Sequence, residues 1–320
     1  MSCYSPLHAY KGKSNNAEKV KIVFRRPDSW KGEKLDLPCG QCIGCRLERS
    51  RQWAVRCMHE ASLYADNSFL TLTYDDAHIP SRPGNCVRCT TPHSINRSLC
   101  VSDFQDFMKR LRKSLAPNPV RFYHCGEYGE NLGRPHYHAL LFNVDFKDKK
   151  FFSSRGGNPI YTSAHLSSLW PQGFAVIGNV TFESAAYVAR YVMKKVNGDR
   201  KTSHYEGLLP EYTTMSRRPG IGARWYEKFK TDVYPHDRII VRGNPTRPPR
   251  FYDNLLARED RSTLELLKIK REKLAQHFVT DVLSNGQKIL VSDQSSERLL
   301  VKEKVKLAEI QNLKRPLEDQ

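Results

Sequence analysis

The sequence lacks any run of roughly 18 or more apolar residues, which excludes a transmembrane helix of ordinary length. Its first residues, Met1 to Pro6, lack the apolar core of a secretory signal, so we expect none. The nine cysteines are odd in number and clustered, which favours free thiols or metal ligands over a set of disulfides. Together these features predict a cytoplasmic protein without a membrane partner.

A phosphate-binding loop is also missing. Gly12, Lys13 and Ser14 match the end of such a loop, but Leu7 stands where its earlier glycine is required. Nothing in the sequence therefore predicts a built-in ATPase or helicase.

Acidic residues are scarce relative to basic ones. The 320 residues include 52 Lys and Arg against 34 Asp and Glu, which gives a net charge of +18 and an isoelectric point near 9.5. Residues 259–320 hold 12 basic and 11 acidic residues, so +17 of that charge lies in residues 1–258. Such an imbalance predicts a partner with a phosphate backbone.

The chain divides into four predicted segments. They are a basic, cysteine-bearing N-terminal segment (1–65), a main domain (66–198), a basic extension with aromatic residues (199–258) and a charged helical tail (259–320). Residues 1–38 read as irregular, and an arginine-rich helix is expected from Cys45 to about Tyr64. The tail reads as two helices separated by a loop near Asn285, with a capping box of Ser262 and Glu265 at the start of the first.

The main domain alternates strand and helix patterns. Strands are predicted at residues 69–74, 120–125, 136–143 and 174–180, a turn-rich connection at 126–135, and helices from Ser102, from Ser163 and over 183–196. Ser102 and Gln105 form a predicted capping box for the first of these helices. This order predicts an α+β fold, with helices packed on an antiparallel β-sheet.

Two histidines stand on the third predicted strand. Alternate residues of a strand share a face, so His136 and His138 point one way and Tyr137 the other. A pair of imidazoles leaves coordination positions open, which suits a catalytic metal. One half-buried and one surface histidine is the alternative interpretation.

A carboxylate is expected as the third ligand. Glu127 and Glu130 both lie before the histidine strand, and Glu127 is favoured because it is nearer the end of the preceding strand. Two histidines and one carboxylate would accept Mg²⁺ or Mn²⁺ acting on phosphate oxygens. Either glutamate could instead be a solvated loop acid.

Tyr187 and Tyr191 are four residues apart on the last predicted helix, so they share one stripe. Lys194 and Lys195 follow, and a cation beside a phenol helps to ionise it. A phenol with an ordinary pKa near ~10 needs such help to act as a nucleophile at neutral pH. Core packing is the alternative for such a pair.

Other residues carry weaker signals. Cys39, Cys42 and Cys45, with Cys86 and Cys89 downstream, have spacings usable for a structural Zn²⁺, and Cys3 could join them; free thiols are the alternative. Candidate DNA contacts are Arg134, Arg190, Lys195, Arg224, Lys228 and Lys230. For residues 224–230, an ordinary amphipathic helix is equally consistent with the pattern.

Three motifs in this order resemble those of the HUH endonucleases. Residues 69–74 (Phe-Leu-Thr-Leu-Thr-Tyr) look like the first motif, residues 136–138 (His-Tyr-His) like the metal strand, and residues 187–194 (Tyr-Val-Ala-Arg-Tyr-Val-Met-Lys) like the two-tyrosine motif. The chain is most similar to the rolling-circle replication initiators of small single-stranded DNA phages, the microviruses of the gokushovirus type. In these, a segment like residues 37–46 also occurs.

The resemblance implies an HUH fold, which is RRM-like, and a nickase mechanism in the host bacterial cytoplasm. A metal held by His136, His138 and Glu127 would polarise a phosphate of single-stranded or supercoiled origin DNA. A tyrosine would attack it, leaving a 5′-phosphotyrosine link and a 3′-OH primer for a host polymerase, with a host helicase as a further partner. The second tyrosine would serve the later cut and religation, and Tyr191 with Lys194 is expected to act first.

Two other functions fit parts of the same pattern. A non-catalytic module could bind single-stranded nucleic acid through its sheet and basic surface. A single-strand transposase could use the same tyrosine chemistry.

Overall fold

The computed structural model describes the chain except for ten short ranges. These are residues 1–2, 13–20, 26–33, 81–97, 130–131, 195–199, 206–207, 276–277, 283–286 and 313–320, together with the side chains of 191–194, 200–201, 281–282 and 291. The described residues form two compact units. Ser50–Glu259 form one, called the sheet unit below, and Met1–Arg49 with Asp260–Lys314 form the other, called the terminal unit.

The sheet unit is built on seven antiparallel strands in the order β10-β5-β6-β4-β9-β8-β7. Their bounds are β4 Asn67–Thr73, β5 Arg121–Tyr128, β6 Pro135–Phe142, β7 Lys150–Arg155, β8 Asn158–Thr162, β9 Ala175–Gly178 and β10 Tyr212–Met215. Every residue of β6 is buried, because the strand is central and both sheet faces are covered there. The antiparallel α+β fold predicted from the sequence is confirmed.

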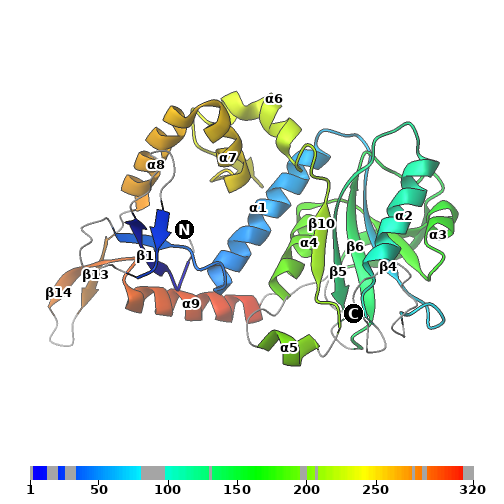
Figure 1. Cartoon of the computed structure of the whole chain (residues 1–320), viewed down its shortest axis with the longest axis horizontal. Helices are drawn as coiled ribbons and strands as arrows, with labels where there is room; N and C mark the ends of the chain where they lie inside the picture. The colour runs from blue at the N-terminus through cyan, green and yellow to red at the C-terminus, as the bar shows by residue number, and fades with distance from the viewer. Residues whose placement is uncertain are drawn as a thin grey trace. The chain divides into compact units, whose positions relative to one another are not determined.

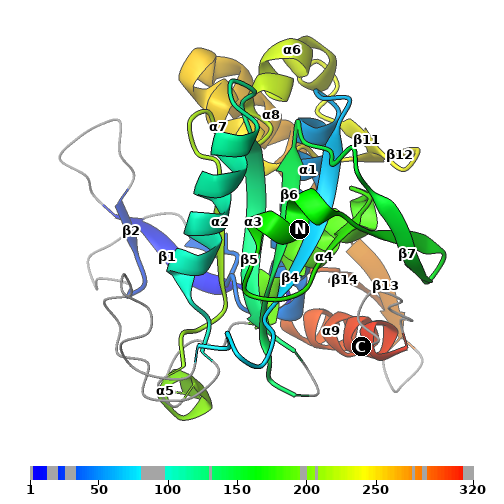
Figure 2. The same cartoon turned by 90° about the vertical axis from the view of Figure 1, so that its right-hand side faces the viewer.

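Helices cover the two faces of this sheet separately (Figures 1 and 2). On one face lie α2 (Val101–Ser114) and α3 (Ala164–Leu169), whose apolar stripes join the core around Leu72, Tyr137 and Trp170. On the other lie α4 (Phe182–Lys194) and the sheet-unit part of α1 (Ile43–Ala61). The sheet therefore separates two cores, and the side chains of each strand alternate between them.

Two parts of this unit were not predicted. Gly156 and Gly157, both with positive φ, form the turn between β7 and β8, a conformation that glycine adopts without steric cost. β10 pairs with β5 at the opposite edge, although it lies beyond residue 198. The remaining elements are α5 (Arg200–Tyr205), α6 (Ala223–Val233), the hairpin β11 (Ile239–Val241) and β12 (Asn244–Thr246), and α7 (Arg250–Glu259).

Two details of the predicted main domain were wrong. α2 begins at Val101 with Cys100 as its N-cap, so Ser102 lies inside the first turn and makes no capping box with Gln105. The predicted turn at 126–135 begins too early, because β5 continues to Tyr128. By contrast, Ser163 caps α3, accepting a hydrogen bond from the Leu166 N–H at 3.0 Å.

The terminal unit corrects the prediction that residues 1–38 are irregular. β1 (Leu7–Gly12) pairs with β2 (Lys21–Val23) and β3 (Lys34–Leu37) in a three-stranded antiparallel sheet. β1 carries exposed and half-buried side chains in which only Ala9 is buried, so its hydrophobic pattern is weak.

The end of the chain contains α8 (Arg261–Ala275) and α9 (Ser296–Gln311), as predicted. A hairpin of β13 (Phe278–Val282) and β14 (Lys288–Ser292) stands between them, where a loop was predicted. The Ser262–Glu265 capping box is also wrong: Asp260 caps the helix, accepting hydrogen bonds from the Thr263 N–H and from two hydroxyls.

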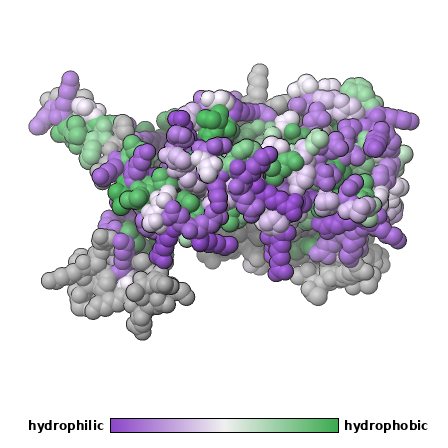
Figure 3. All heavy atoms as spheres, turned by 90° about the horizontal axis from the view of Figure 1, so that it is seen from above, coloured by the Kyte–Doolittle hydropathy of each residue, from purple (hydrophilic) through white to green (hydrophobic). Residues whose placement is uncertain are grey.

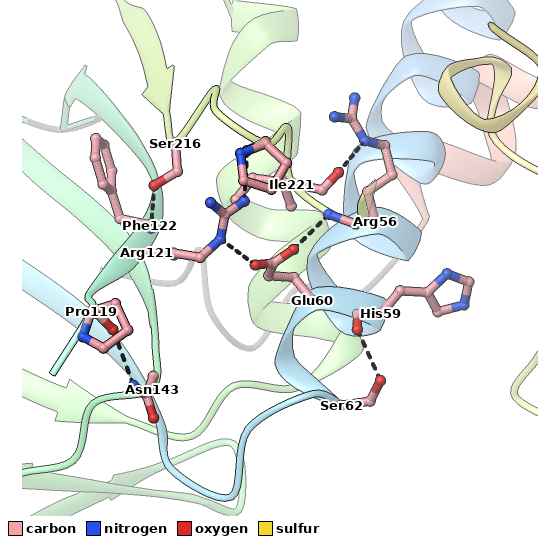
Figure 4. A network of polar contacts seen from close by, with 12 residues as sticks. Arg56, His59, Glu60, Ser62, Pro119, Arg121, Phe122, Asn143, Ser216 and Ile221 are labelled. Carbon is pink, nitrogen blue, oxygen red and sulfur yellow. Dashed lines mark hydrogen bonds and ion pairs between the residues drawn. The ribbon is translucent and has the colours of Figure 1, made fainter. Parts of the chain in front are cut away.

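A buried ion pair ties the loop after β10 to the sheet (Figure 4). The Arg121 guanidinium donates to the Glu60 carboxylate and, at 2.8 Å, to the Pro219 carbonyl, while the Gly222 N–H donates to Glu60 at 2.7 Å. Ile221, between those two backbone contacts, is fully buried in the α4-side core. The ion pair therefore stabilises a segment on which α4 packs.

Polar side chains dominate the face of the molecule seen in Figure 3, with small groups of hydrophobic ones between them. Within the described part of the chain, no helix is both long and apolar enough to cross a membrane.

Candidate metal and tyrosine site

Strand register brings three metal-ligand side chains together. β5 and β6 are antiparallel, with Glu127 opposite His136 and Cys125 opposite His138. Residues directly opposite each other share a face, so Glu127 and both histidines point to the α4 side. Tyr137 points to the other core, where its hydroxyl donates to the Cys100 carbonyl at 2.7 Å. The predicted alternation along this strand is confirmed.

The three side chains converge closely. Glu127 Oε1 lies 2.7 Å from His136 Nε2 and 2.9 Å from His138 Nε2. One ligand atom from each residue lies within 4.8 Å of the others. All three are buried, with exposed fractions of 1% for Glu127, 5% for His136 and 2% for His138. The open, half-solvated histidine pair considered from sequence alone is therefore wrong.

The hydrogen bonds of His136 indicate what the cluster can hold. Its Nδ1 lies 3.0 Å from the Arg134 carbonyl, which can only accept, so Nδ1 carries the proton. In a neutral ring the Nε2 lone pair then faces the Glu127 oxygen, and two acceptors at 2.7 Å require a cation or a proton between them. The donor set of two imidazoles and a carboxylate thus fits a divalent metal.

Thr71 orients the second histidine. Its Oγ1 lies 3.0 Å from His138 Nδ1, the nitrogen that points away from Glu127, because β4 pairs Thr71 directly with His138. Metal-ligating histidines are commonly held in this way through their other ring nitrogen. Sequence analysis missed Thr71, since only the register of β4 against β6 places it beside His138.

Electrostatics favour an ionised carboxylate in this cluster. Burial by itself raises the pKa of Glu127, but hydrogen bonds and charge interactions with His136 and His138 outweigh that effect. The net result is a pKa of Glu127 below its usual value. An anionic oxygen is therefore present at neutral pH to balance a bound cation.

A tyrosine of α4 reaches the same cluster. α4 starts after Thr181, whose N–H and side chain exchange hydrogen bonds with Ser184 in a reciprocal cap at 2.8 and 3.2 Å. Six residues after the cap, the Tyr187 hydroxyl lies 3.4 Å from His138 Nε2. Phe69 borders both rings, edge-to-face with Tyr187 and stacked on His138. A phenol thus stands beside the candidate metal ligands.

Other predicted site residues lie outside the described residues. α4 extends through Lys194, but nothing is described of the side chains of Tyr191 and Lys194 or of any part of Lys195 and Glu130. Their predicted roles are therefore untested.

Four cysteines form a second cluster, in the terminal unit. The sulfurs of Cys3, Cys39, Cys42 and Cys45 all lie within 4.8 Å of one another. Three backbone N–H groups donate to them: Cys39 to the Cys3 sulfur at 3.3 Å, Tyr4 to Cys42 at 3.3 Å, and Cys42 to Cys39 at 3.2 Å. Cys86 and Cys89, also predicted for this site, lie outside the described residues.

The thiols of this cluster affect each other's ionisation. Burial raises the pKa of Cys42, but hydrogen bonds from Tyr4, Cys45 and Cys39 lower it further, to about 7. Burial and the neighbouring Cys3 and Cys42 raise the pKa of Cys45. Four sulfurs this close favour a shared cation, which would relieve the repulsion between thiolates.

The predicted DNA contacts are dispersed in the sheet unit. Arg134 binds the end of β4, donating to Asp76 at 2.7 Å and to the Tyr74 carbonyl at 2.9 Å. Arg190 is half-buried on α4.

The basic-aromatic stretch at 224–230 forms α6. Arg224 and Lys228 are exposed, and Lys230 pairs with Glu259. Tyr226 is buried, and Trp225 stacks on His59, so these two aromatic rings serve packing. The amphipathic-helix interpretation is confirmed.

Comparison with known proteins adds sequence relatives. A model of the replication-associated protein ORF2 family matches residues 67–196. Replication-associated protein VP4 of Bdellovibrio phage phiMH2K is 33% identical over 264 residues, which cover 79% of this chain and 76% of that protein. Replication-associated protein ORF2 of Spiroplasma virus 4 is 31% identical over 342 residues, covering 99% and 98%.

A more distant relative is replication-associated protein ORF4 of Chlamydia phage 1, 29% identical over 69% of this chain and 53% of that protein. No solved structure matches the chain. The resemblance carried by the three motifs is confirmed by relatives that extend over almost the whole length. The chain belongs to the replication-associated protein ORF2 family.

Proposed function

We propose that the chain is a metal-dependent, site-specific DNA nickase and strand-transfer enzyme that initiates rolling-circle replication of a small single-stranded DNA phage. The observation that carries this proposal is the Tyr187 hydroxyl, 3.4 Å from His138 in the buried Glu127–His136–His138 cluster. The surplus of +17 in residues 1–258 supports a phosphodiester substrate. We assign the chemistry to residues 66–198, with the basic extension and the helical tail as accessory segments.

Glu127, His136 and His138 would hold Mg²⁺ or Mn²⁺, which when bound supplies a Lewis acid for a phosphate oxygen. The chain's own groups do the rest. Arg134 and Thr71 hold the two imidazoles through their Nδ1 atoms, so that both Nε2 atoms face Glu127. α4 holds the phenol of Tyr187 beside them, where a phosphate bound at the cluster would be within its reach.

In the cleavage step a tyrosine oxygen attacks the scissile phosphorus. The new phosphorus–phenol bond forms as the bond from phosphorus to the 3′ oxygen breaks; the phenol loses its proton and the leaving oxygen gains one. The products are a 5′-phosphotyrosine and a 3′-OH that primes a host polymerase, assisted by a host helicase. After one round the second tyrosine cuts the restored origin, and the free 3′-OH reseals the released strand.

Two phenols one helical turn apart suit this alternation, because each reaches one cluster in turn. Tyr191 with Lys194 as the first nucleophile stays a prediction. Tyr187 is the phenol whose position beside His138 supports its part in the reaction.

The test is covalent capture. The full chain with Mn²⁺ and tiled, 5′- or 3′-labelled single strands of the replicon that encodes it should form an SDS-resistant adduct on one strand. The Tyr187→Phe/Tyr191→Phe double variant and His138→Gln should form none. The control Tyr161→Phe, whose ring lies on β8 outside the site, should react normally.

An absent wild-type adduct, or one that persists in the double variant, would refute the nickase. Retardation of single strands that depends on salt but ignores EDTA would then favour a non-catalytic binding module. Adducts formed at the ends of a mobile element would favour the transposase.

We also propose that Cys3, Cys39, Cys42 and Cys45 bind a structural Zn²⁺, since four sulfurs with N–H donors complete a tetrahedral set. Metal analysis of the purified chain should find about one zinc per chain. Cys3→Ser should lose most of it, whereas Cys100→Ser, a buried thiol of the sheet unit, should retain it. Loss in Cys86→Ser/Cys89→Ser, with retention in Cys3→Ser, would overturn this ligand set.

A further inference from the structure

A recess opens beside the tyrosine and histidine of the candidate site. It has a volume of about 260 Å³, room for roughly nine water molecules at liquid density. His138, Tyr187 and Ser184 line one side, and Phe152, Phe174 and Arg155 the other. The recess lies wholly within the sheet unit.

The recess exists because α4 covers only part of its sheet face. α4 contacts β5, β6 and β10, whereas among the described elements of the sheet unit no helix covers the strands toward β7 on that side (Figure 2). Their inward-facing residues form the floor: Thr71 of β4 pairs with Val176 of β9, and Ile160 of β8 lies beyond. All three are half-buried, in contrast to the fully buried residues beneath α4.

Two exposed aromatic rings form the outer wall. Phe152 and Phe174 are 56% and 50% exposed, and their centroids are 5.4 Å apart with the planes tilted by 58°. The β7–β8 register shifts between Phe151 and Ser153, so Phe152 is the bulged residue. A bulge re-aims a side chain, here toward the ring of Phe174, which precedes β9. Solvated rings of this kind are available to stack on a planar ligand.

The charges around the recess select an anionic partner. None of the described residues that line it is an aspartate or glutamate, and Arg155 stands on its rim. Lys147 and Lys150 are exposed on the segment leading into the same hairpin. Asn158 and Asn179 add neutral hydrogen-bonding groups. Aromatic faces, basic side chains and amides together match a nucleotide: a base for the rings, and phosphates for Lys150 and Arg155.

We infer that this recess binds one unpaired base of the DNA strand next to the scissile phosphate, stacked on Phe152 and Phe174, with Arg155 and Lys150 on the adjoining backbone. This inference rests on the proposed nickase function and gives it a substrate-positioning subsite. Holding that base would place the neighbouring phosphate between His138 and Tyr187, which line the same recess. The extra β7–β8 hairpin is thereby a specificity element of the sheet.

Binding and chemistry are measured separately to test it. Binding uses a fluorescein-labelled 20-nucleotide mixed-sequence single strand with the full chain in EDTA, so that no cleavage occurs. Phe152→Ala and Phe174→Ala should each weaken Kd by about 5- to 100-fold, as expected for a lost base stack. Phe152→Trp should restore it. Phe151→Ala is the matched control: the same side chain on the same strand, 66% exposed and outside the lining.

Lys150→Gln and Arg155→Gln should each lower the slope of log Kd against log salt by about 0.7. In a parallel assay, Mn²⁺-dependent adduct formation by Phe152→Ala at saturating strand should start from unchanged Mn²⁺ affinity. The inference is overturned if both alanine variants bind the strand like the wild type, or if Phe151→Ala loses as much as they do. A wild type that binds but forms no adduct would refute the nickase and leave the base subsite standing.

Discussion

The buried Glu60–Arg121 ion pair offers a stability test that reaches the site through packing. Glu60→Ala removes the carboxylate that accepts from Arg121 and from the Gly222 N–H. The Arg121 side chain, only 8% exposed, would keep its charge without that partner. The segment bearing Ile221, which packs in the core that also contains Tyr187, would lose one of its anchors.

The magnitude follows from burial. Breaking a buried pair by removing one partner costs about 3–5 kcal/mol, because the other charge is left desolvated. Replacing both, as in Glu60→Leu/Arg121→Met, removes both charges and should cost less than the sum of the single variants, by about 2 kcal/mol or more. For a unit of this size, 3–5 kcal/mol corresponds to a fall in Tm of roughly 6–20 °C.

Urea unfolding followed by tryptophan fluorescence measures this, because Trp53, Trp170 and Trp225 all lie in the sheet unit. The control is Asp106→Ala, which breaks an exposed pair with Lys109 on α2 and should cost less than about 1 kcal/mol. A loss below about 1 kcal/mol for Glu60→Ala, or strict additivity in the double variant, would show that the pair is not desolvated as described.

Three further predictions concern single contacts. Thr71→Val should weaken Mn²⁺ binding by about 10- to 100-fold while Thr71→Ser retains it, because the hydroxyl orients His138; titration calorimetry would decide, and equal affinities would exclude that role. Tyr137→Phe should cost about 1–3 kcal/mol in urea unfolding without altering Mn²⁺ affinity, since its hydroxyl bonds the buried backbone of Cys100 on the opposite face; a loss of metal binding would contradict this separation. Burial lowers the pKa of His59 from 6.5 to about 4, so the unfolded chain binds the extra proton and stability should fall by up to about 3 kcal/mol as the pH drops from 6.5 to 4. His59→Phe should flatten this part of the urea-midpoint profile, and an unchanged slope would assign the effect to other groups.

Much of the fold could be predicted because its central elements follow simple periods. The strand around residues 67–73 alternates buried and half-buried side chains, and the helix from Val101 repeats apolar residues three and four apart. Edge elements gave no such pattern. The β7 strand has an exposed, irregular face, and β10 gains its strand conformation from pairing with β5, far away in the sequence. Tertiary pairing, which a local pattern does not contain, decides such segments.

The candidate site divides in the same way. The face shared by His136 and His138 follows from a period of two within one strand. Glu127 needed one further fact, that β5 continues past Gly126 and pairs with the histidine strand. Thr71 and Cys3 required register and distant chain segments, because the first lies on a neighbouring strand and the second is 36 residues from Cys39. Spacing reveals ligands that share an element, and it leaves the others ambiguous.

The central strand also explains how one element serves both stability and chemistry. Tyr137 is neutral, fully buried and hydrogen-bonded on the α2 side, whereas the flanking histidines carry their lone pairs into the α4 side. A carboxylate and two imidazoles buried to 5% exposure or less would be costly without a cation to satisfy them. A metal that binds only the folded chain therefore stabilises it, by about 2.7 kcal/mol at a concentration 100 times its Kd. On this argument the site is a stability deficit that its own metal offsets, and occupation of the cluster links folding of the sheet to readiness for cleavage.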